Sequence, residues 1–414
     1  MKDVLILSAS AGAGHISAAR ALESAFKESY PCVSVRHEDA LEYTNLAFRK
    51  VYCDAYIEMV NALPELLGFL YDYADHPWKD EKRRLAIDRL NSLPLIRLLE
   101  KEQPEHVVCT HFLPAEIISY LICKKRLNSN LSVVVTDMDI HAMWLCRHYS
   151  NYFVALEETR EHLHRLGFDK SSVHVTGIPV APQFKVRKDK MEMREKFGLA
   201  PDLPTIYMSS GGYGVGRTEE IIEALTAVKT ECQLLAMCGN NQALKERLEV
   251  FKTSLPGSCK LKVHPIPYTH QVDEYMSASD LVLGKPGGLT TAEALSKELG
   301  FIIINPIPGQ EERNSDHLLE RGVALKCNNL PALAFKVDSL LNDQVKLDSM
   351  QANAKKMARP NAAENIAGIL IQTNSNHPVQ TNKDKKHLCK SRVLQLLQRR
   401  LGHDMGRTSL RSVS

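Results

Sequence analysis

Short apolar runs alternate with amphipathic helical segments along most of the 414-residue chain. In the first half this pattern predicts strands at residues 3–8, 33–36, 106–110, 131–136, 152–155 and 173–176. The alternation restarts after Pro204, where strands are predicted in the run TIYMS and at 233–238, 260–264, 280–283, 301–304 and 322–326. Such alternation is typical of parallel sheets covered by helices on both faces. The sequence therefore predicts an α/β protein with two similar doubly wound halves.

The proline-containing connection TGIPVAPQFKVRKDK, residues 176–190, separates the two halves. A chain of this length exceeds one ordinary hydrophobic core, so two domains are expected. We predict a first domain at 1–180 and a second at 190–372. Each would open with a strand, a glycine-containing loop and a helix, because this order appears at the start of both halves.

Two segments depart from the alternating pattern. Residues 41–100 contain no convincing strand and are rich in aromatic side chains, so we predict a helical insertion in the first domain. Residues 373–414 begin polar and become basic, with nine Lys and Arg against two Asp from Lys383 onward. We predict a disordered tail there, and its basic residues interleaved with leucines fit an anionic membrane surface.

Bulk composition narrows the function classes. The formal net charge is only +3, so no nucleic-acid partner is expected. The ten cysteines form no C-x-x-C pair and several lie in apolar runs, which favours buried free thiols in a reducing cytoplasm over disulfides or a zinc site. No apolar stretch approaches the ~20 residues of a transmembrane helix. We therefore expect a cytoplasmic protein that lies at most on a membrane surface.

The stretch SDLVLGKPGGLTTAEAL, residues 279–295, contains a candidate diphosphate site. A predicted strand ends just before Gly287 and Gly288, and a helix begins next to them. Backbone N–H groups and the helix dipole favour an anion at such a turn, and Thr290 adds a hydroxyl donor. Glu293 lies one turn into the helix, where a carboxylate can accept hydrogen bonds from a ribose.

The next strand, FIIIN, is followed by PIPGQEERN, which places a second polar cluster at the neighbouring turn. Its side chains are Gln310, Glu311 and Asn314. A bare phosphate would not need this second cluster, whereas a nucleotide diphosphate with a polar appendage fits both turns. The alternative for the first turn alone is a simple glycine turn with a helix cap.

A further glycine loop, SSGGYGVG, follows the first strand of the second half and includes Ser210, Gly211 and Gly212. It is a second candidate anion site, but it lacks the G-x-x-x-x-G-K-[ST] pattern of P-loop NTPases. Dinucleotide binding would require an acidic residue at the end of the following strand, which here ends LLAMCGN. NAD binding is therefore not expected.

His15 follows the first strand in LILSASAGAGHISAARAL, at the carboxyl end where open parallel sheets bind ligands. The helix dipole disfavours a cationic imidazole there, which keeps the ring neutral and able to act as a base. Asp137 ends another strand on the same rim and is predicted to orient His15. A lone histidine can equally cap or pack, and the D-x-D pair of Asp137 and Asp139 is expected to cap a helix rather than bind a metal.

These stretches together resemble the monogalactosyldiacylglycerol synthase and processive diacylglycerol glucosyltransferase family, which is related to MurG. The resemblance covers residues 1–372 and rests on LSASAGAGHISAARAL, VVTDMDIHAMW, YFVALEET, VTGIPV, YMSASDLVLGKPGGLTTAEAL and INPIPGQEERN. The family often has three consecutive glycines before the histidine, whereas Ala11 and Ala13 interrupt them here and the turn passes through Gly12 and Gly14.

The resemblance implies a GT-B fold, in which two Rossmann-like domains face each other across an interdomain cleft. It also implies a UDP-sugar donor and inversion at the anomeric carbon, with no metal or other cofactor. By this resemblance His15 is the catalytic base and Asp137 lines the acceptor side, where His141 and Trp144 lie in the same motif. The donor-binding positions would be Gly14, Ser210, Gly211, Gly212, Tyr268, Gly287, Gly288, Thr290, Glu293, Gln310, Glu311 and Asn314.

Residues and resemblance together predict an inverting hexosyltransferase that moves galactose or glucose from a UDP-sugar to diacylglycerol. It would act as a peripheral protein at the cytoplasmic face of the membrane, and the insertion at 41–100 would admit the lipid. Two alternatives remain open. One is transfer of a hexose or GlcNAc to a polyprenyl-linked or other acceptor, and the other is a regulator that binds sugar nucleotides without catalysis.

Overall fold

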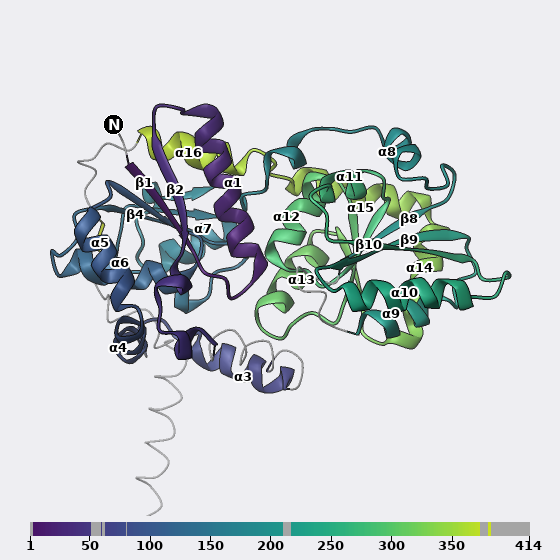
Figure 1. Ribbon diagram of the computed structural model, residues 1–414, viewed down its shortest axis with the longest axis horizontal. Coiled ribbons are helices and arrows are strands. Elements are labelled where there is room, and N and C mark those ends of the chain that lie inside the picture. The colour runs from purple at the N-terminus through teal and green to yellow at the C-terminus, as the bar shows by residue number, and fades with distance from the viewer. Residues whose placement is uncertain are drawn as a thin grey trace, which may run out of the picture.

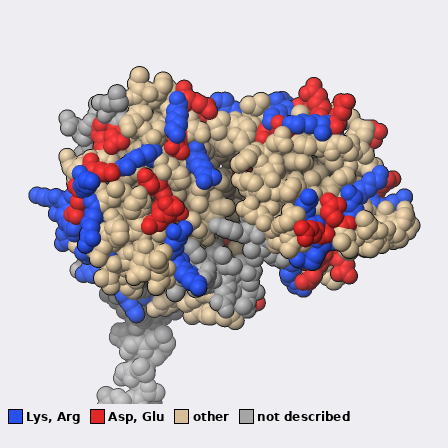
Figure 2. All heavy atoms as spheres, viewed as in Figure 1, with Lys and Arg blue, Asp and Glu red and all other residues tan. Residues whose placement is uncertain are grey.

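The computed structural model describes residues 3–50, 59, 63–79, 81–209, 217–372 and 380–381. It contains two six-stranded parallel sheets side by side, each flanked by helices (Figure 1). Figure 2 shows the two domains as two lobes that meet along a narrow seam. This arrangement confirms the predicted α/β architecture with two Rossmann-like halves. Two of the predicted features, the basic tail apart from residues 380–381 and the loop at 210–216, lie outside the described residues.

The first sheet has the strand order β2-β1-β3-β4-β6-β7. Its strands are β1 (Asp3–Ser8), β2 (Ser34–Asp39), β3 (His106–Cys109), β4 (Asn130–Val134), β6 (Asn151–Val154) and β7 (Val173–Val175). The order reverses direction between β1 and β3, and the carboxyl ends of strands at such a switch point are where α/β proteins bind ligands. His15 follows β1 directly at this point.

The second sheet has the order β10-β9-β8-β11-β12-β13, which is the 3-2-1-4-5-6 order of dinucleotide-binding folds. Its strands are β8 (Thr205–Ser209), β9 (Cys232–Gly239), β10 (Leu261–Pro267), β11 (Leu281–Gly284), β12 (Gly300–Ile304) and β13 (Ala324–Cys327). The switch point lies between β8 and β11, and the predicted glycine turn at 287–288 follows β11.

The segments between these strands form amphipathic helices, most of which pack their apolar faces on the sheets. Those of the first half are α1 (Ala13–Ser29), α3 (Pro64–Ala74), α4 (Glu81–Asn91), α5 (Leu93–Glu102), α6 (Phe112–Cys123) and α7 (Glu157–Arg165). Those that follow are α8 (Lys190–Lys196), α9 (Thr218–Leu225), α10 (Gln242–Ser254), α11 (Val272–Ser277), α12 (Gly288–Ser296), α13 (Gln310–Glu320), α14 (Leu333–Leu341), α15 (Gln344–Met357) and α16 (Ala362–Gln372). No described helix is long and apolar enough to cross a bilayer.

The strands read as continuous apolar runs because both sheet faces are covered by helices. In β1, for example, every residue from Val4 to Ser8 is buried. The described part of the predicted insertion at 41–100 includes a short 3-10 turn, helical residues at 46–50, α3, α4 and most of α5, and no strand. The eight cysteines within the described residues are all free, and five of them are buried.

The last helix crosses back to the first domain. Although α16 follows the whole second sheet in the chain, Ala363, Ile366, Ala367 and Leu370 share a buried cluster with Phe26 and other residues of α1 and β1. Figure 1 shows α16 beside α1 at the top of the first lobe. The predicted second domain of 190–372 therefore includes a helix that packs on the first domain, because its apolar face is complementary to α1 rather than to its own sheet.

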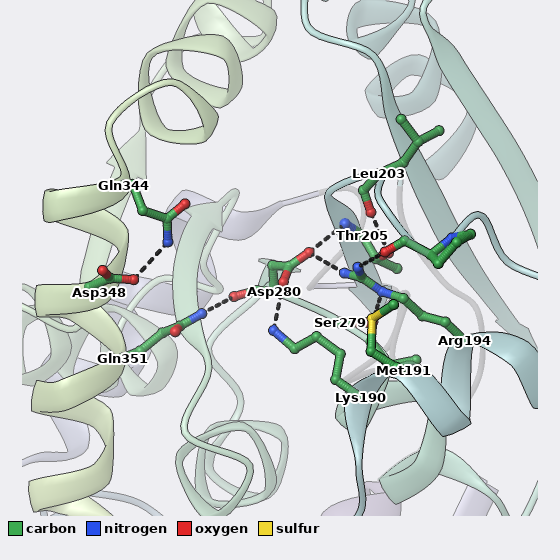
Figure 3. A network of polar contacts seen from close by, with 12 residues as sticks. Lys190, Met191, Arg194, Leu203, Thr205, Ser279, Asp280, Gln344, Asp348 and Gln351 are labelled. Atoms are coloured by element: carbon green, nitrogen blue, oxygen red, sulfur yellow. Dashed lines mark hydrogen bonds and ion pairs between the residues drawn. The ribbon is translucent and has the colours of Figure 1, made fainter.

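A polar network at the amino ends of β8 and β11 anchors the second domain's outer helices (Figure 3). Asp280, just before β11, accepts hydrogen bonds from Lys190 Nζ (2.6 Å), Arg194 Nη2 (2.6 Å) and the Thr205 backbone N–H (2.7 Å). Its carbonyl accepts one from Gln351 on α15 at 2.9 Å. The network fixes the strands at the end opposite the candidate site.

Candidate active site

The carboxyl ends of the two sheets face each other and touch. A Cβ atom added at Gly288, the first residue of α12, would come well within 3.0 Å of the Thr136 carbonyl oxygen, closer than real Cβ atoms approach. Only glycine therefore fits at this position. The predicted interdomain site is thus formed by direct contact of the β4 turn of the first domain with the β11 turn of the second.

His15 lies in the first turn of α1 and is held by the neighbouring strand ends. Its Nδ1 is 2.9 Å from the carbonyl oxygen of Thr110, which directly follows β3, and 3.0 Å from Thr136 Oγ1. A carbonyl only accepts, so the Nδ1 atom carries the proton and donates it. Nε2 is then the unprotonated nitrogen, and it makes no hydrogen bond within the described part of the chain.

The surroundings of His15 keep the ring neutral. Burial lowers the pKa of His15 to about 4, and the hydrogen bond to Thr110 opposes this shift only in part. The His111 ring stands edge-on to His15 with 4.6 Å between centroids, and the Trp144 ring lies at 6.3 Å. A neutral imidazole with a free Nε2 lone pair is the form that a general base requires.

Asp137 does not orient His15, which corrects the sequence-based pairing. Its Oδ1 accepts hydrogen bonds from Gln310 Nε2 at 2.7 Å and Asn314 Nδ2 at 3.4 Å, both on α13 of the other domain. Burial raises the pKa of Asp137 to about 6, and these two amides partly oppose the rise. A backbone carbonyl, that of Thr110, takes the orienting role that was predicted for a carboxylate.

Asn314 joins the two domains at the centre of the site. It is fully buried; its Oδ1 accepts from the Met138 backbone N–H at 2.9 Å, and its Nδ2 donates to the Pro286 carbonyl at 3.1 Å. Three residues predicted from two separate motifs, Asp137 from one and Gln310 and Asn314 from the other, are therefore brought together. The amides hold the β4 turn against the start of α13.

The Glu311 side chain hydrogen-bonds the backbone of the loop that precedes α13. Its Oε2 accepts from the Ile307 backbone N–H at 2.7 Å, and its Oε1 lies 3.5 Å from where a Cβ would stand on Gly287. Burial raises the pKa of Glu311 to about 7, while the positive charge of Lys285 acts in the opposite direction. Lys285, which sequence analysis did not single out, thus brings a cation beside the predicted diphosphate turn.

Glu293 lies in the second turn of α12 and makes no hydrogen bond to the described residues. Burial, with a smaller contribution from the charge of Asp273, raises the pKa of Glu293 to about 8. Thr290 lies one turn earlier on the half-buried side of α12. A carboxyl with this pKa is largely protonated at neutral pH, so Glu293 can both donate to and accept from hydroxyl groups of a ligand.

Three of the predicted donor residues, Ser210, Gly211 and Gly212, lie outside the described residues. Tyr268 follows β10 at the edge of the second sheet, two strands from β8. Its side chain is 53% exposed and packs on the His270 ring at 5.2 Å. Gly14 meets the other domain, since a Cβ there would lie 3.6 Å from Leu289 Cβ.

The two predicted acceptor-side residues differ in what they contact. His141 Nδ1 accepts from the Met143 backbone N–H at 3.1 Å and its Nε2 donates to the Tyr71 carbonyl at 2.9 Å, so both nitrogens are engaged. Trp144 is buried and presents its ring to His15. His141 therefore secures the α3 insertion, whereas Trp144 forms part of the wall beside the candidate base.

Sequence reasoning missed Thr110 and His111, which lie in no quoted motif, and Thr136, which lies in VVTDMDIHAMW but was not singled out. Their position in the chain was the available signal: HVVCTH ends β3, which is next to β1, and VVVTD ends β4, which is next to β3, so these residues had to reach the same carboxyl-end rim of the sheet. It also missed Arg313 and Asp75, which form an ion pair between α13 and the end of α3.

Comparisons with known proteins agree with this geometry. Residues 15–180 match the family model for monogalactosyldiacylglycerol (MGDG) synthase, and residues 189–357 match that for glycosyl transferases group 1. A processive diacylglycerol beta-glucosyltransferase from Bacillus licheniformis is 28% identical over 375 residues, which is 90% of this chain and 95% of that protein.

Solved structures share the fold. MurG from Acinetobacter baumannii aligns with a TM-score of 0.61 at 15% identity, over 90% of this chain and all of that one. The MnaA–UDP co-structure from S. aureus aligns with a TM-score of 0.58 at 15% identity, over 92% of this chain and all of that one. The fold is therefore GT-B. Both family models and near-full-length relatives agree: the chain is similar to the monogalactosyldiacylglycerol synthase and processive diacylglycerol glucosyltransferase family over most of its length, and it is a hexosyltransferase.

Proposed function

We propose that this protein transfers a hexose, glucose or galactose, from a UDP-sugar to diacylglycerol with inversion at the anomeric carbon. The observation that carries the proposal is His15, whose Nδ1 proton is fixed on the Thr110 carbonyl so that Nε2 is the free base. This base lies at the seam where the two sheets present their carboxyl ends, next to the start of α12. Acceptor and donor would thus meet between the domains.

In the proposed step, Nε2 of His15 removes the proton from the acceptor hydroxyl as its oxygen attacks C1 of the sugar. The new O–C1 bond forms on the face opposite the bond from C1 to the diphosphate oxygen, which breaks and releases UDP. Inversion follows from this single displacement. Burial disfavours the imidazolium that forms, so the proton must leave His15 before the next turnover.

The second domain supports a role in binding the donor. Gly287 and Gly288 open α12, whose N-terminal N–H groups and dipole favour the diphosphate, and Lys285 adds a positive charge nearby. Glu293 offers two unused carboxyl oxygens to ribose hydroxyls. The polar start of α13 would contact the sugar. We propose that these groups stabilise the departing UDP without a metal or other cofactor, so activity should survive EDTA.

The insertion supports a lipid acceptor and a peripheral position at the cytoplasmic face of a membrane. Helix α3 has no buried residue, and it exposes Leu66 (45%), Phe69 (66%) and Tyr73 (51%). Nearby in the chain, α4 exposes Ile87 and Leu90. Both helices lie along the lower edge of the first lobe in Figure 1. Exposed apolar side chains of this kind mark an interaction surface, and a bilayer suits them.

The test is a donor and acceptor screen. The full chain would be incubated with UDP-glucose, UDP-galactose or UDP-GlcNAc and with vesicles that contain diacylglycerol, a polyprenyl phosphate or neither, and products identified by mass spectrometry. The proposal predicts a hexosyl-diacylglycerol from one of the first two donors. Transfer only to the polyprenyl lipid would favour the MurG-like alternative, and UDP-sugar binding without any transfer would favour a regulator.

A further inference from the structure

An ion pair links the insertion to the donor-side helix. Arg313 Nη2 on α13 lies 2.6 Å from Asp75 Oδ2, at the C-terminal end of α3. The same guanidinium lies 3.8 Å from Asp72 and 3.6 Å from Asp139 of the first domain, and 5.2 Å from the centroid of the Tyr71 ring. One cation of the second domain is therefore surrounded by three carboxylates and an aromatic ring of the first.

Asp75 also connects this pair to the acceptor side. Its Oδ1 accepts a hydrogen bond from the Ala142 backbone N–H at 2.8 Å and lies 3.8 Å from His141 Nε2. Burial alone would raise the pKa of Asp75, but the hydrogen bonds from Arg313 and Ala142 hold the pKa below its usual value. The carboxylate is thus charged at neutral pH and joins α3, the 137–144 segment and α13.

Close packing surrounds the ion pair. A Cβ on Gly309, which has a φ of +88° just before α13, would lie 2.5 Å from Tyr71 Cδ1, so the ring sits directly on this backbone. A Cβ on Gly68 would lie 2.8 Å from Pro308 Cβ. Only glycine permits both approaches. The α3 helix is therefore seated on the loop and first turn of α13 at two backbone contacts as well as by charge.

Arg313 lies on the same face of α13 as the predicted sugar-binding residues, so the Arg313–Asp75 ion pair can affect the donor site. Gln310, Arg313 and Asn314 are spaced three and four residues apart, so they share one face of the helix. Gln310 and Asn314 bond Asp137, and Arg313 bonds Asp75, across the same interface. Movement of α3 away from α13 would release the face that carries the sugar-side amides.

We propose that Asp75 and Arg313 are positioning residues that couple the seating of α3 to the assembly of the sugar-binding end of the donor site. This inference rests on the proposed function, which makes α3 the lipid-facing helix and the start of α13 the sugar-binding part of the donor site. The outer face of α3 is the proposed lipid-facing surface. Binding of α3 to the membrane would therefore also fix the position of α13 and, with it, the side chains that align the donor sugar. Neither residue touches the reacting atoms.

A second arginine that reaches across to the first domain, Arg321 at the C-terminal cap of α13, provides the matched control. Arg321 Nη2 lies 3.2 Å from Glu158 Oε2 of α7, but the Glu158 side chain is 61% exposed. Exposed pairs of this kind contribute little, and Arg321 lies two turns beyond Asn314. Arg321→Gln removes the same charge from the same helix at the same interface without touching the α3 contact.

The first experiment measures binding to the intact protein by calorimetry. The affinities of UDP and of the UDP-hexose that wild type uses would be compared in wild type, Arg313→Gln, Asp75→Asn, the double variant and Arg321→Gln. We expect UDP to bind all five alike. We expect Arg313→Gln and Asp75→Asn to lose about tenfold in affinity for the sugar nucleotide relative to UDP, and Arg321→Gln to lose none.

The second experiment measures transfer to diacylglycerol vesicles. Arg313→Gln and Asp75→Asn should each lower kcat/KM for the UDP-hexose, the double variant should fall no further than the worse single, and Arg313→Lys should recover part of the loss. Losses that multiply in the double variant, or an Arg313→Gln enzyme indistinguishable from Arg321→Gln, would overturn the inference. Wild type that binds no UDP-sugar would instead overturn the proposed function.

Discussion

The contact of Gly288 with Thr136 gives the sharpest prediction for a single substitution. Gly288→Ala adds one methyl group whose carbon would overlap the Thr136 carbonyl oxygen, while lying 3.1 Å from Asp137 Oδ1. Both neighbours are buried and the clash is with backbone, so no side-chain rotation relieves it. We expect the first turn of α12 and the β4 turn to move apart.

The size of the effect follows from what that movement breaks. The Gln310–Asp137 bond of 2.7 Å and the Asn314–Met138 bond of 2.9 Å cross the same interface. A hydrogen bond to a charged group contributes about 1.5–3 kcal/mol, and a misplacement of about 1 Å in a reacting geometry can cost 10²-fold. We therefore expect kcat/KM to fall by about 10²-fold, with the fold intact.

The assay compares Gly288→Ala with Gly14→Ala, which adds the same methyl group to the same interface from the other side. A Cβ at Gly14 meets Leu289 Cβ at 3.6 Å, an ordinary contact, so no separation is expected. Initial rates of hexosyl-diacylglycerol formation would be measured for both, with circular dichroism to confirm folding. A Gly288→Ala enzyme as active as wild type would refute the steric argument for a closed interface at Gly288.

Three further predictions follow from other parts of the structure. Glu293→Ala should raise KM for the UDP-sugar by about tenfold with a smaller change in kcat, because the methyl group keeps neither hydrogen-bonding oxygen of the carboxyl; unchanged KM would remove Glu293 from the donor site. Phe69→Ser on α3 should weaken sedimentation with diacylglycerol-containing vesicles but leave UDP affinity unchanged, and equal sedimentation would place the membrane surface elsewhere. Burial and the nearby Glu116 raise the pKa of Asp88 to about 7, so the free energy of unfolding should fall as pH rises from about 4 to 7 and level off above that range. Asp88→Asn should remove a fall of up to about 4 kcal/mol in urea unfolding, and an unchanged pH dependence would contradict this reasoning.

The strand pattern and the position of His15 could be predicted because both depend on local sequence. Apolar runs such as DVLILS bury both faces in a parallel sheet, and the turn after the first strand must reach the carboxyl-end rim. The glycine turn at 287–288 and the polar start of α13 were found for the same reason. Each is a strand end followed by residues with an evident chemistry.

What could not be predicted depends on contacts between distant segments. The partner of His15 is the carbonyl of Thr110, and a backbone acceptor leaves no trace in the sequence. Asp137 was expected beside His15, but the docking of the second domain offers it two amides instead. The packing of α16 on α1 could not be predicted either. The apolar face of an amphipathic helix indicates that the helix packs on another element, but it does not identify that element.

The role of His15 as the base is the central claim, and one comparison tests it most directly. Transfer from the UDP-hexose to diacylglycerol would be measured under single-turnover conditions for wild type and His15→Ala, together with the affinity of each for UDP. The account predicts that transfer falls by about 10²–10⁴-fold in the variant while the dissociation constant for UDP is unchanged. Transfer by His15→Ala at a rate comparable to wild type would contradict it.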